Sequence, residues 1–166
     1  MVRPMLHPAN DLETLYRDRF GAFLSTVTAL LGNAEEARDV VQDAFATALK
    51  QRQHHTGSGS LEAWVWRIVV NRALDRRRAR TRTAQLQTEV LNAASSNGGY
   101  DEAAAVRAQL LALPDRQRLA VFLRYYADLD YEAIARVLEI SPGTVGAALN
   151  HARSTLRVRL KEEARE

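Results

Sequence analysis

The chain has no cysteine among its 166 residues. This absence excludes disulfide bonds, thiolate nucleophiles and cysteine-ligated zinc sites, and it fits a protein of a reducing compartment. No apolar run approaches the ~20 residues that a membrane-spanning helix needs. The first residues of the chain also lack the pattern of a signal peptide. We therefore expect a cytoplasmic protein without membrane insertion.

Residues that could carry catalysis or hold a cofactor are equally scarce. Of the four histidines, only His54 and His55 are adjacent, and they lie on a predicted loop with no acidic companion. Such a pair makes a poor metal site. No glycine-rich loop opens a helix to cradle a phosphate, and no nucleophile is paired with a base. The sequence therefore predicts a protein that is not an enzyme and that holds no cofactor and no metal.

The net charge of +3 is unevenly distributed along the chain. Residues 51–82 carry eight basic and two acidic side chains, a local charge of +6. Residues 1–50 and residues 83–112 are each at −2, and residues 113–166 are at +1. Nearly all of the asymmetry thus lies in one segment of the chain. That segment is the candidate for a surface that faces phosphate groups.

Apolar residues recur at helical spacing along most of the chain, and no convincing strand appears. The pattern weakens over residues 83–100, where a run of Ala, Ser, Asn and Gly is typical of a flexible linker. The sequence predicts an all-α protein made of two small helical domains. We expect the first over residues 10–82 and the second over residues 101–162.

Punctuating residues predict where the helices begin and end. Asn10 or Asp11 is expected to cap the first helix, and Gly32-Asn33 to separate it from a second helix over residues 34–51. In the second domain Asp115 is expected to cap a helix after the break at Leu113-Pro114. The apolar faces of these helices are expected to include Leu49 and Tyr126.

Residues 131–153 fit a helix-turn-helix. Asp130 caps the first short helix, Ala135 is small enough for the helices to cross, and Ile140 supplies an apolar residue in the turn. Ser141-Pro142 then opens the second helix, with Ser as the N-cap and Pro at the first helical position. Such a pair places the start of its second helix in the major groove of DNA. The alternative is a helical hairpin within a bundle.

Seven arginines lie within sixteen residues of the basic segment, against the single acid Asp75. They surround more than one face of a helix, which suits contacts to a phosphate backbone that position a protein without reading sequence. Trp64 and Trp66 immediately precede the cluster, and aromatic side chains beside a basic track suit stacking on single-stranded bases. The alternative is a solvated helix end.

Asp39, Gln42 and Asp43 form a polar edge on the second predicted helix. Because acidic side chains repel phosphate, this edge is expected to point away from any nucleic acid. It either faces solvent or docks a basic protein partner.

Three segments occur in an order that resembles bacterial RNA polymerase sigma factors, in particular the small two-domain extracytoplasmic function (ECF) group. Residues 34–45, AEEARDVVQDAF, resemble the helix that binds the core polymerase. Residues 64–75, WVWRIVVNRALD, resemble the helix that melts the promoter and reads its −10 element. The runs LPDRQR at 113–118, YEAIA at 131–135 and SPGTV at 141–145 resemble the domain that reads the −35 element.

The resemblance implies partners and roles for particular residues. The partners are core RNA polymerase and promoter DNA, together with an anti-sigma factor of the kind that often restrains this group. The loop over residues 53–61 would form part of a pocket for a flipped base. Polymerase binding is implied for Asp39, Gln42 and Asp43. Binding to −10 DNA is implied for Trp64, Arg67, Asn71, Arg72 and Arg76. Binding to −35 DNA is implied for Arg124, Arg136, Thr144, Ala147, Ala148, Asn150, His151 and Arg153.

The recognition helix departs from the pattern of the family. Lys and Arg are usual after Thr144-Val145, whereas residues 146–151 here read GAALNH. We therefore expect weak or unusual reading of the −35 element. Two alternatives remain beside a sigma factor. One is a stand-alone helix-turn-helix regulator that binds duplex DNA as a dimer. The other is a module that docks on polymerase and has weakened −35 reading.

Overall fold

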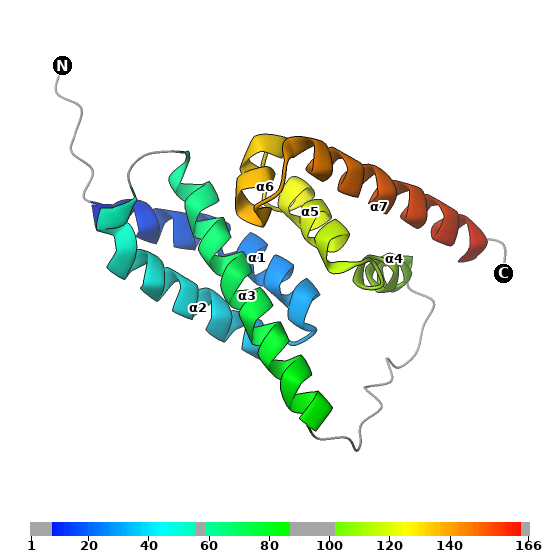
Figure 1. Ribbon diagram of the computed structural model, residues 1–166, viewed down its shortest axis with the longest axis horizontal. Coiled ribbons are helices and arrows are strands. Elements are labelled where there is room, and N and C mark those ends of the chain that lie inside the picture. The colour runs from blue at the N-terminus through cyan, green and yellow to red at the C-terminus, as the bar shows by residue number, and fades with distance from the viewer. Residues whose placement is uncertain (1–7, 56–58, 87–101, 164–166) are drawn as a thin grey trace.

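The computed structural model describes residues 8–55, 59–86 and 102–163, and these residues form helices and no strand (Figure 1). The sequence prediction of an all-α protein with two helical domains and a carboxy-terminal helix-turn-helix is thereby confirmed. Most of the predicted linker lies outside the described residues. The helices are α1 (Pro8–Leu31), α2 (Ala34–Gln51), the short 3-10 turn η1 (Arg52–His54), α3 (Leu61–Leu86), α4 (Glu102–Leu111), α5 (Asp115–Tyr125), α6 (Tyr131–Leu138) and α7 (Pro142–Glu163).

The amino-terminal domain consists of α1, α2 and α3, which pack on one another. Gly32 ends α1 with φ +74°, a left-handed conformation that glycine adopts without strain. Asn33 then caps α2, because its side-chain oxygen accepts a hydrogen bond of 2.9 Å from the backbone N–H of Glu36. At α3 the hydroxyl of Ser60 accepts from the N–H of Ala63 in the same way, at 3.1 Å. Side-chain caps thus fix where α2 and α3 begin.

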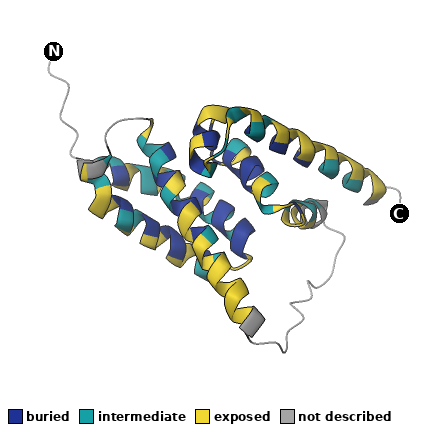
Figure 2. Cartoon of the chain, in the orientation of Figure 1, coloured by how far each residue is buried: buried dark blue, intermediate teal, exposed yellow. Residues whose placement is uncertain are grey.

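Aromatic side chains occupy the centre of this domain. Phe23 is fully buried between Trp66, at a centroid distance of 4.1 Å, and Phe45, at 5.1 Å. Val41 and Val69 belong to the same core cluster and are also inaccessible to solvent. Buried residues accordingly follow the inner faces of the three helices, while the far end of α3 is exposed (Figure 2).

The carboxy-terminal domain consists of α4 to α7, with α7 packed along α5 and α6. Asp130 caps α6 by accepting from the N–H of Ala133 at 2.7 Å, and Ser141 caps α7 by accepting from Thr144 at 3.1 Å, so both predicted caps are confirmed. Glu139 makes the turn between them with φ +55°. Its backbone conformation is uncommon for a residue with a side chain. The helix-turn-helix therefore rests on two caps and one left-handed residue.

Several predicted boundaries and faces were wrong. Helix α1 begins at Pro8 and not at Asn10 or Asp11, since proline is well suited to the first turn. Pro114, not Asp115, occupies the N-cap position of α5. Leu49 and Tyr126 are more than half exposed. Leu49 lies in the last turn of α2, and Tyr126 is the C-cap residue that follows α5. An apolar period along the sequence does not show which side chains another helix covers.

The two domains are packed together. Helix α6 lies against α3, and α5 lies against α1. The buried apolar side chains of both domains form one continuous cluster. Arginines also cross the boundary: Arg118 donates to the backbone oxygen of Ala29 at 2.8 Å, and Arg19 donates to that of Ala127 while it pairs with Glu62 at 2.9 Å. We call this packing the closed arrangement.

Gly21 is a position at which the stability of α1 can be raised. It lies in the middle of the helix, and a β-carbon added there would meet no atom within 4 Å. We expect Gly21→Ala to raise the free energy of unfolding by about 0.5–1 kcal/mol, because alanine loses less conformational entropy in a helix. Urea denaturation followed by circular dichroism measures this. The control is Gly32→Ala, which should lower the free energy of unfolding because residue 32 has a positive φ. A Gly32→Ala variant more stable than Gly21→Ala would contradict the conformations assigned to these two glycines.

Candidate nucleic-acid and polymerase interfaces

Helix α2 presents the predicted polymerase-binding residues to solvent. Asp39, Gln42 and Asp43 are all exposed and lie at helical spacing on one face. The opposite face, with Val40, Val41 and Ala44, is buried against α1 and α3. Because α2 lies on the far side of α3 from α6 and α7 (Figure 1), the closed arrangement leaves this acidic face open.

Three of the predicted −10 residues form a stripe on the outer face of α3. Trp64, Arg67 and Asn71 recur at intervals of three and four residues, which places them on one side of a helix. Trp64 is half-buried and stacks on His55, with ring centroids 5.0 Å apart. Asn71 is exposed. The same spacing adds Arg78 and Arg82, two exposed residues that the sequence interpretation placed in the basic cluster without assigning them to DNA.

The other two predicted −10 residues lie on the flank of α3 and face α2. Arg72 donates to the hydroxyl of Thr47 at 2.8 Å. Arg76 pairs with Glu36 at 3.7 Å, and Arg80 reaches the same carboxylate at 3.1 Å. Part of the arginine cluster is therefore occupied in holding helices together. The distribution of charge along the sequence does not show which arginines bind DNA and which hold helices together. That distinction depends on which arginines face a neighbouring helix.

Trp66 does not contribute an exposed aromatic ring beside the arginines, contrary to the sequence interpretation. It is fully buried, and its indole N–H donates to Glu62 at 3.4 Å. The inner face of α3 is centred between Trp66 and Val69, which leaves Trp64 as the aromatic side chain on the outer stripe.

The recognition helix α7 carries most of the predicted −35 residues. Ala147, Asn150, His151 and Arg153 are exposed, and Thr144 is half-buried. Ala148 is the exception. Only 9% of its surface is accessible, and it belongs to the core cluster. Its assignment to the DNA-facing surface was therefore wrong, because position 148 faces α5 and α6 together with the neighbouring buried Val145 and Leu149.

Arg153 is held to one side of the recognition helix. Its guanidinium donates to the hydroxyl of Tyr125 through Nε at 3.0 Å and Nη2 at 2.5 Å. This hydrogen bond raises the pKa of Arg153. Of the two arginines outside α7, Arg124 donates to the backbone oxygen of Leu129 at 3.2 Å, and Arg136 is exposed near Gly59.

The closed arrangement occupies one predicted DNA-binding residue. Arg67 on the outer stripe of α3 forms an ion pair with Glu139 in the turn of the helix-turn-helix. A second pair joins Arg77 of α3 to Asp115 at the start of α5. Burial lowers the pKa of the neighbouring Arg118, and the Asp115 carboxylate opposes that effect. The outer stripe of α3 is thus in contact with the turn of the helix-turn-helix, and the outer face of α7 takes no part in these two pairs.

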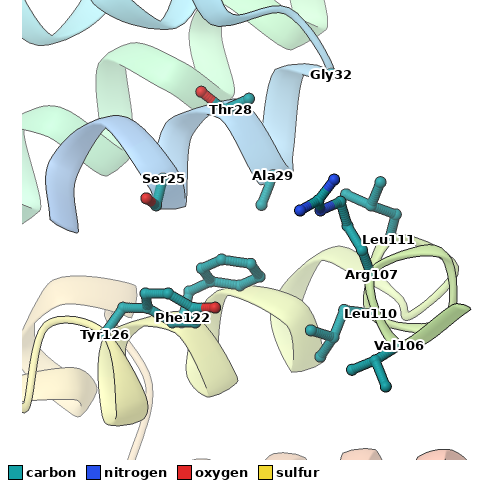
Figure 3. A pocket seen from close by; sticks show the side chains of 10 residues that line it. All are labelled: Ser25, Thr28, Ala29, Gly32, Val106, Arg107, Leu110, Leu111, Phe122 and Tyr126. Atoms are coloured by element: carbon teal, nitrogen blue, oxygen red, sulfur yellow. The ribbon is translucent and has the colours of Figure 1, made fainter. Parts of the chain in front are cut away.

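A pocket of about 870 Å³ lies between the domains. In Figure 3, Ser25 and Ala29 of α1 point towards Phe122 of α5 and Tyr126, the residue that follows α5, and Thr28 also lines the pocket. The remaining lining residues, which come from α4 and from the end of α1, are Gly32, Val106, Arg107, Leu110 and Leu111. The pocket is mainly apolar and carries one cation.

Within the described ranges, no group of three or more histidine or acidic side chains is arranged to hold a metal ion. In the same part of the chain, no helix is long and apolar enough to cross a membrane.

Comparison with known proteins identifies both domains. The family model for sigma-70 region 2 matches residues 15–83, and that for sigma-70 region 4 matches residues 103–156. The ECF RNA polymerase sigma factor SigW of Bacillus subtilis is 27% identical over 92% of this chain and 88% of its own length. The ECF sigma factor SigM of Mycobacterium tuberculosis is 34% identical over 74% of this chain and 63% of its own length.

Solved structures share the fold. The sigma factor RpoE of Bartonella quintana, crystallised with the anti-sigma factor NepR, superposes with a TM-score of 0.76 at 23% identity, over 91% of this chain and 97% of that one. CnrH in complex with the cytosolic domain of CnrY gives 0.68 at 21% identity. The two regions, in this order, define a sigma factor. The chain belongs to the ECF group of bacterial RNA polymerase sigma factors, which direct promoter-specific transcription initiation with RNA polymerase.

Proposed function

We propose that this sigma factor divides its work among three separate surfaces. The acidic face of α2, with Asp39, Gln42 and Asp43, binds the core polymerase. The outer stripe of α3 captures −10 bases through Trp64 and Asn71. The outer face of α7 reads the −35 element. The observation that carries this proposal is the exposure of all three surfaces on different helices of one chain whose two regions match the family models.

The protein acts by binding and has no catalytic activity of its own. Promoter opening costs a few kcal/mol per unstacked base, and capture of extruded bases on α3 offsets that cost. The arginines along α3 provide phosphate contacts that position the strand. The place of action is the cytoplasm, where the polymerase and the promoter are. Arg72 and Arg76 reach DNA in this proposal only by leaving Thr47 and Glu36.

The domains separate when the promoter is bound. The −35 and −10 elements are about 25 base pairs apart, which spans about 85 Å of B-DNA at 3.4 Å per pair. In the closed arrangement the helix-turn-helix touches α3 through Glu139 and Arg67. One rigid closed molecule therefore does not read both elements, and Arg67 binds DNA only after it leaves Glu139.

An anti-sigma factor is the third partner in this proposal. The similar sigma factors RpoE and CnrH were crystallised with anti-sigma proteins. In this chain, the pocket between α1, α4 and α5 spans both domains and is mainly apolar. A partner segment seated there would contact both domains at once and would stabilise the closed arrangement, because it would bind that arrangement only.

Reversing the charge of the acidic partners in the interdomain ion pairs tests whether the two domains separate. We expect Asp115→Lys with Glu139→Lys to increase the open fraction severalfold, because each lysine would face an arginine across the interface. The absence of cysteine allows a dye pair at Lys50→Cys and Arg157→Cys, two exposed positions in different domains. Energy transfer between the dyes should fall. The control, Glu35→Lys with Glu162→Lys, changes the net charge by the same amount at positions away from these ion pairs, and it should leave the energy transfer unchanged. Equal energy transfer in the wild type and both variants would contradict the role of the ion pairs.

Asn71 tests the proposed −10 surface. Its amide lies on the exposed stripe of α3, so Asn71→Ala should leave the fold and closed-complex formation unchanged. We expect promoter opening to fall by about tenfold, in line with the 1–3 kcal/mol of a good base contact. Permanganate reactivity of unpaired thymines measures opening, and a filter-binding assay measures closed complexes. Equal loss of both would count against the role of Asn71 in melting.

The general test is to mix the full chain with core RNA polymerase. Formation of a complex that starts transcription at sites sharing −10 and −35 elements would support the proposal. The uncharged recognition helix favours one other function, a polymerase-docking module with weakened −35 reading. Complexes that start at sites with a −10 element alone would support that function.

A further inference from the structure

We propose that Asn150 is the residue that determines the −35 specificity of this sigma factor, and that it reads an adenine in the major groove. The inference rests on the proposed function of α7 as the −35 reader. It adds the base that is read, the side chain that reads it, and the atoms involved.

The geometry of α7 singles out Asn150. Its outward face over the first four turns consists of Gly143, Ala147, Asn150 and Ser154, which are exposed and recur at intervals of three and four residues. Val145, Ala148 and Leu149 point into the core. On this face, asparagine is the one side chain that both donates and accepts through a planar amide. Among the described residues, no hydrogen bond occupies that amide.

Neighbouring polar groups on α7 are engaged or lie to one side. His151 is exposed, but it is turned by about 100° from Asn150 around the helix axis and lies beside the outward face. Thr144 shares a hydrogen bond of 2.8 Å with Ser141 at the helix start. Arg153 is tied to Tyr125 on α5. Position 146 is a glycine, and a β-carbon there would lie 3.6 Å from the ring of Tyr131, so this side of the helix faces α6. The cations on the outward face begin only with Arg157, two turns beyond Asn150.

The chemistry then selects the base. Arginine or lysine recognises guanine O6 and N7, whereas asparagine recognises adenine, donating to N7 and accepting from the N6 amino group. A recognition face with no cation in its first three turns therefore has no means of reading guanine in the usual way. The small residues Gly143 and Ala147 beside Asn150 allow the helix backbone to approach the base edges closely. The methyl group of Ala147 suits contact with a thymine methyl group next to that adenine.

The test uses the holoenzyme of the full chain and core polymerase on a promoter found by mapping its start sites. Each −35 adenine is replaced in turn by 7-deazaadenine, which removes only the N7 acceptor. We expect one position at which this replacement lowers wild-type initiation by about 5-fold or more, the lower end of a bidentate contact. Asn150→Ala should lower initiation on the natural promoter by a similar factor. With this variant, 7-deazaadenine at that position should cause no further loss of initiation. Ser154→Ala, one turn away on the same face, should keep the full sensitivity.

The outcomes separate the inference from the function on which it rests. Sensitivity at one adenine that disappears in Asn150→Ala supports the inference. Start sites that are indifferent to 7-deazaadenine at every −35 position, or a sensitivity that Asn150→Ala retains, would overturn it and leave the sigma function intact. No start sites at all would overturn both. Circular dichroism and polymerase binding of Asn150→Ala verify that the variant is folded.

Discussion

Asp39→Arg combined with Asp43→Arg should reduce binding to core RNA polymerase by about 100-fold or more. Both carboxylates are exposed on one face of α2, and neither has an ion-pair partner among the described residues, so the change leaves the fold intact. Close charge pairs at protein interfaces contribute on the order of 1.5–7 kcal/mol each, and reversal replaces attraction with repulsion. Fluorescence anisotropy of labelled protein titrated with polymerase measures the change.

A matched control distinguishes the effect of this acidic face on polymerase binding from the effect of net charge. Asp18→Arg with Glu162→Arg alters the total charge by the same amount at two exposed positions on other helices. We expect that variant to bind polymerase within about twofold of the wild type. Wild-type affinity in the Asp39 and Asp43 variant would show that the acidic face of α2 is not the docking surface.

Trp66→Ala should destabilise the protein by about 3–5 kcal/mol, the range for truncation of a buried aromatic side chain. Trp66 is fully buried on Phe23 and donates to Glu62, so its removal leaves both a cavity and a carboxylate without that donor. A loss of this size is a large fraction of the total stability of a typical domain. Thermal or urea unfolding measures it.

Trp64→Ala is the comparison that distinguishes the two tryptophans. Trp64 is half-buried and stacks on His55, so its loss should cost much less stability than that of Trp66. It should instead reduce capture of single-stranded −10 DNA, because stacking contributes about 1–3 kcal/mol per base. Equal destabilisation by both substitutions would contradict the division of α3 into an inner and an outer face.

Local signals in the sequence predicted most of the helices. The glycine and asparagine after Leu31, the Asp130 cap and the Ser141-Pro142 start are short-range chemistry, and each occurs in the structure as expected. Family resemblance predicted the order of the surfaces. The helix starts and ends were predictable because they depend on residues that are close together in the sequence.

The features that depend on tertiary contact were not predictable in this way. Leu49 and Tyr126 continue an apolar period but are more than half exposed, and Ala148 continues an exposed segment but faces the core. The pairing of Arg67 with Glu139 joins residues 72 positions apart. Because such contacts follow from how the domains pack, sequence periodicity contains no signal for them.

Transcription from a supercoiled genomic library by core RNA polymerase, with and without this protein, tests whether the protein directs promoter-specific initiation. Sequencing of the 5′ ends of the transcripts identifies the start sites. We expect new start sites that share −35 and −10 elements, and we expect the Asp39→Arg, Asp43→Arg variant to lose them. Start sites identical to those of core polymerase alone would contradict this expectation.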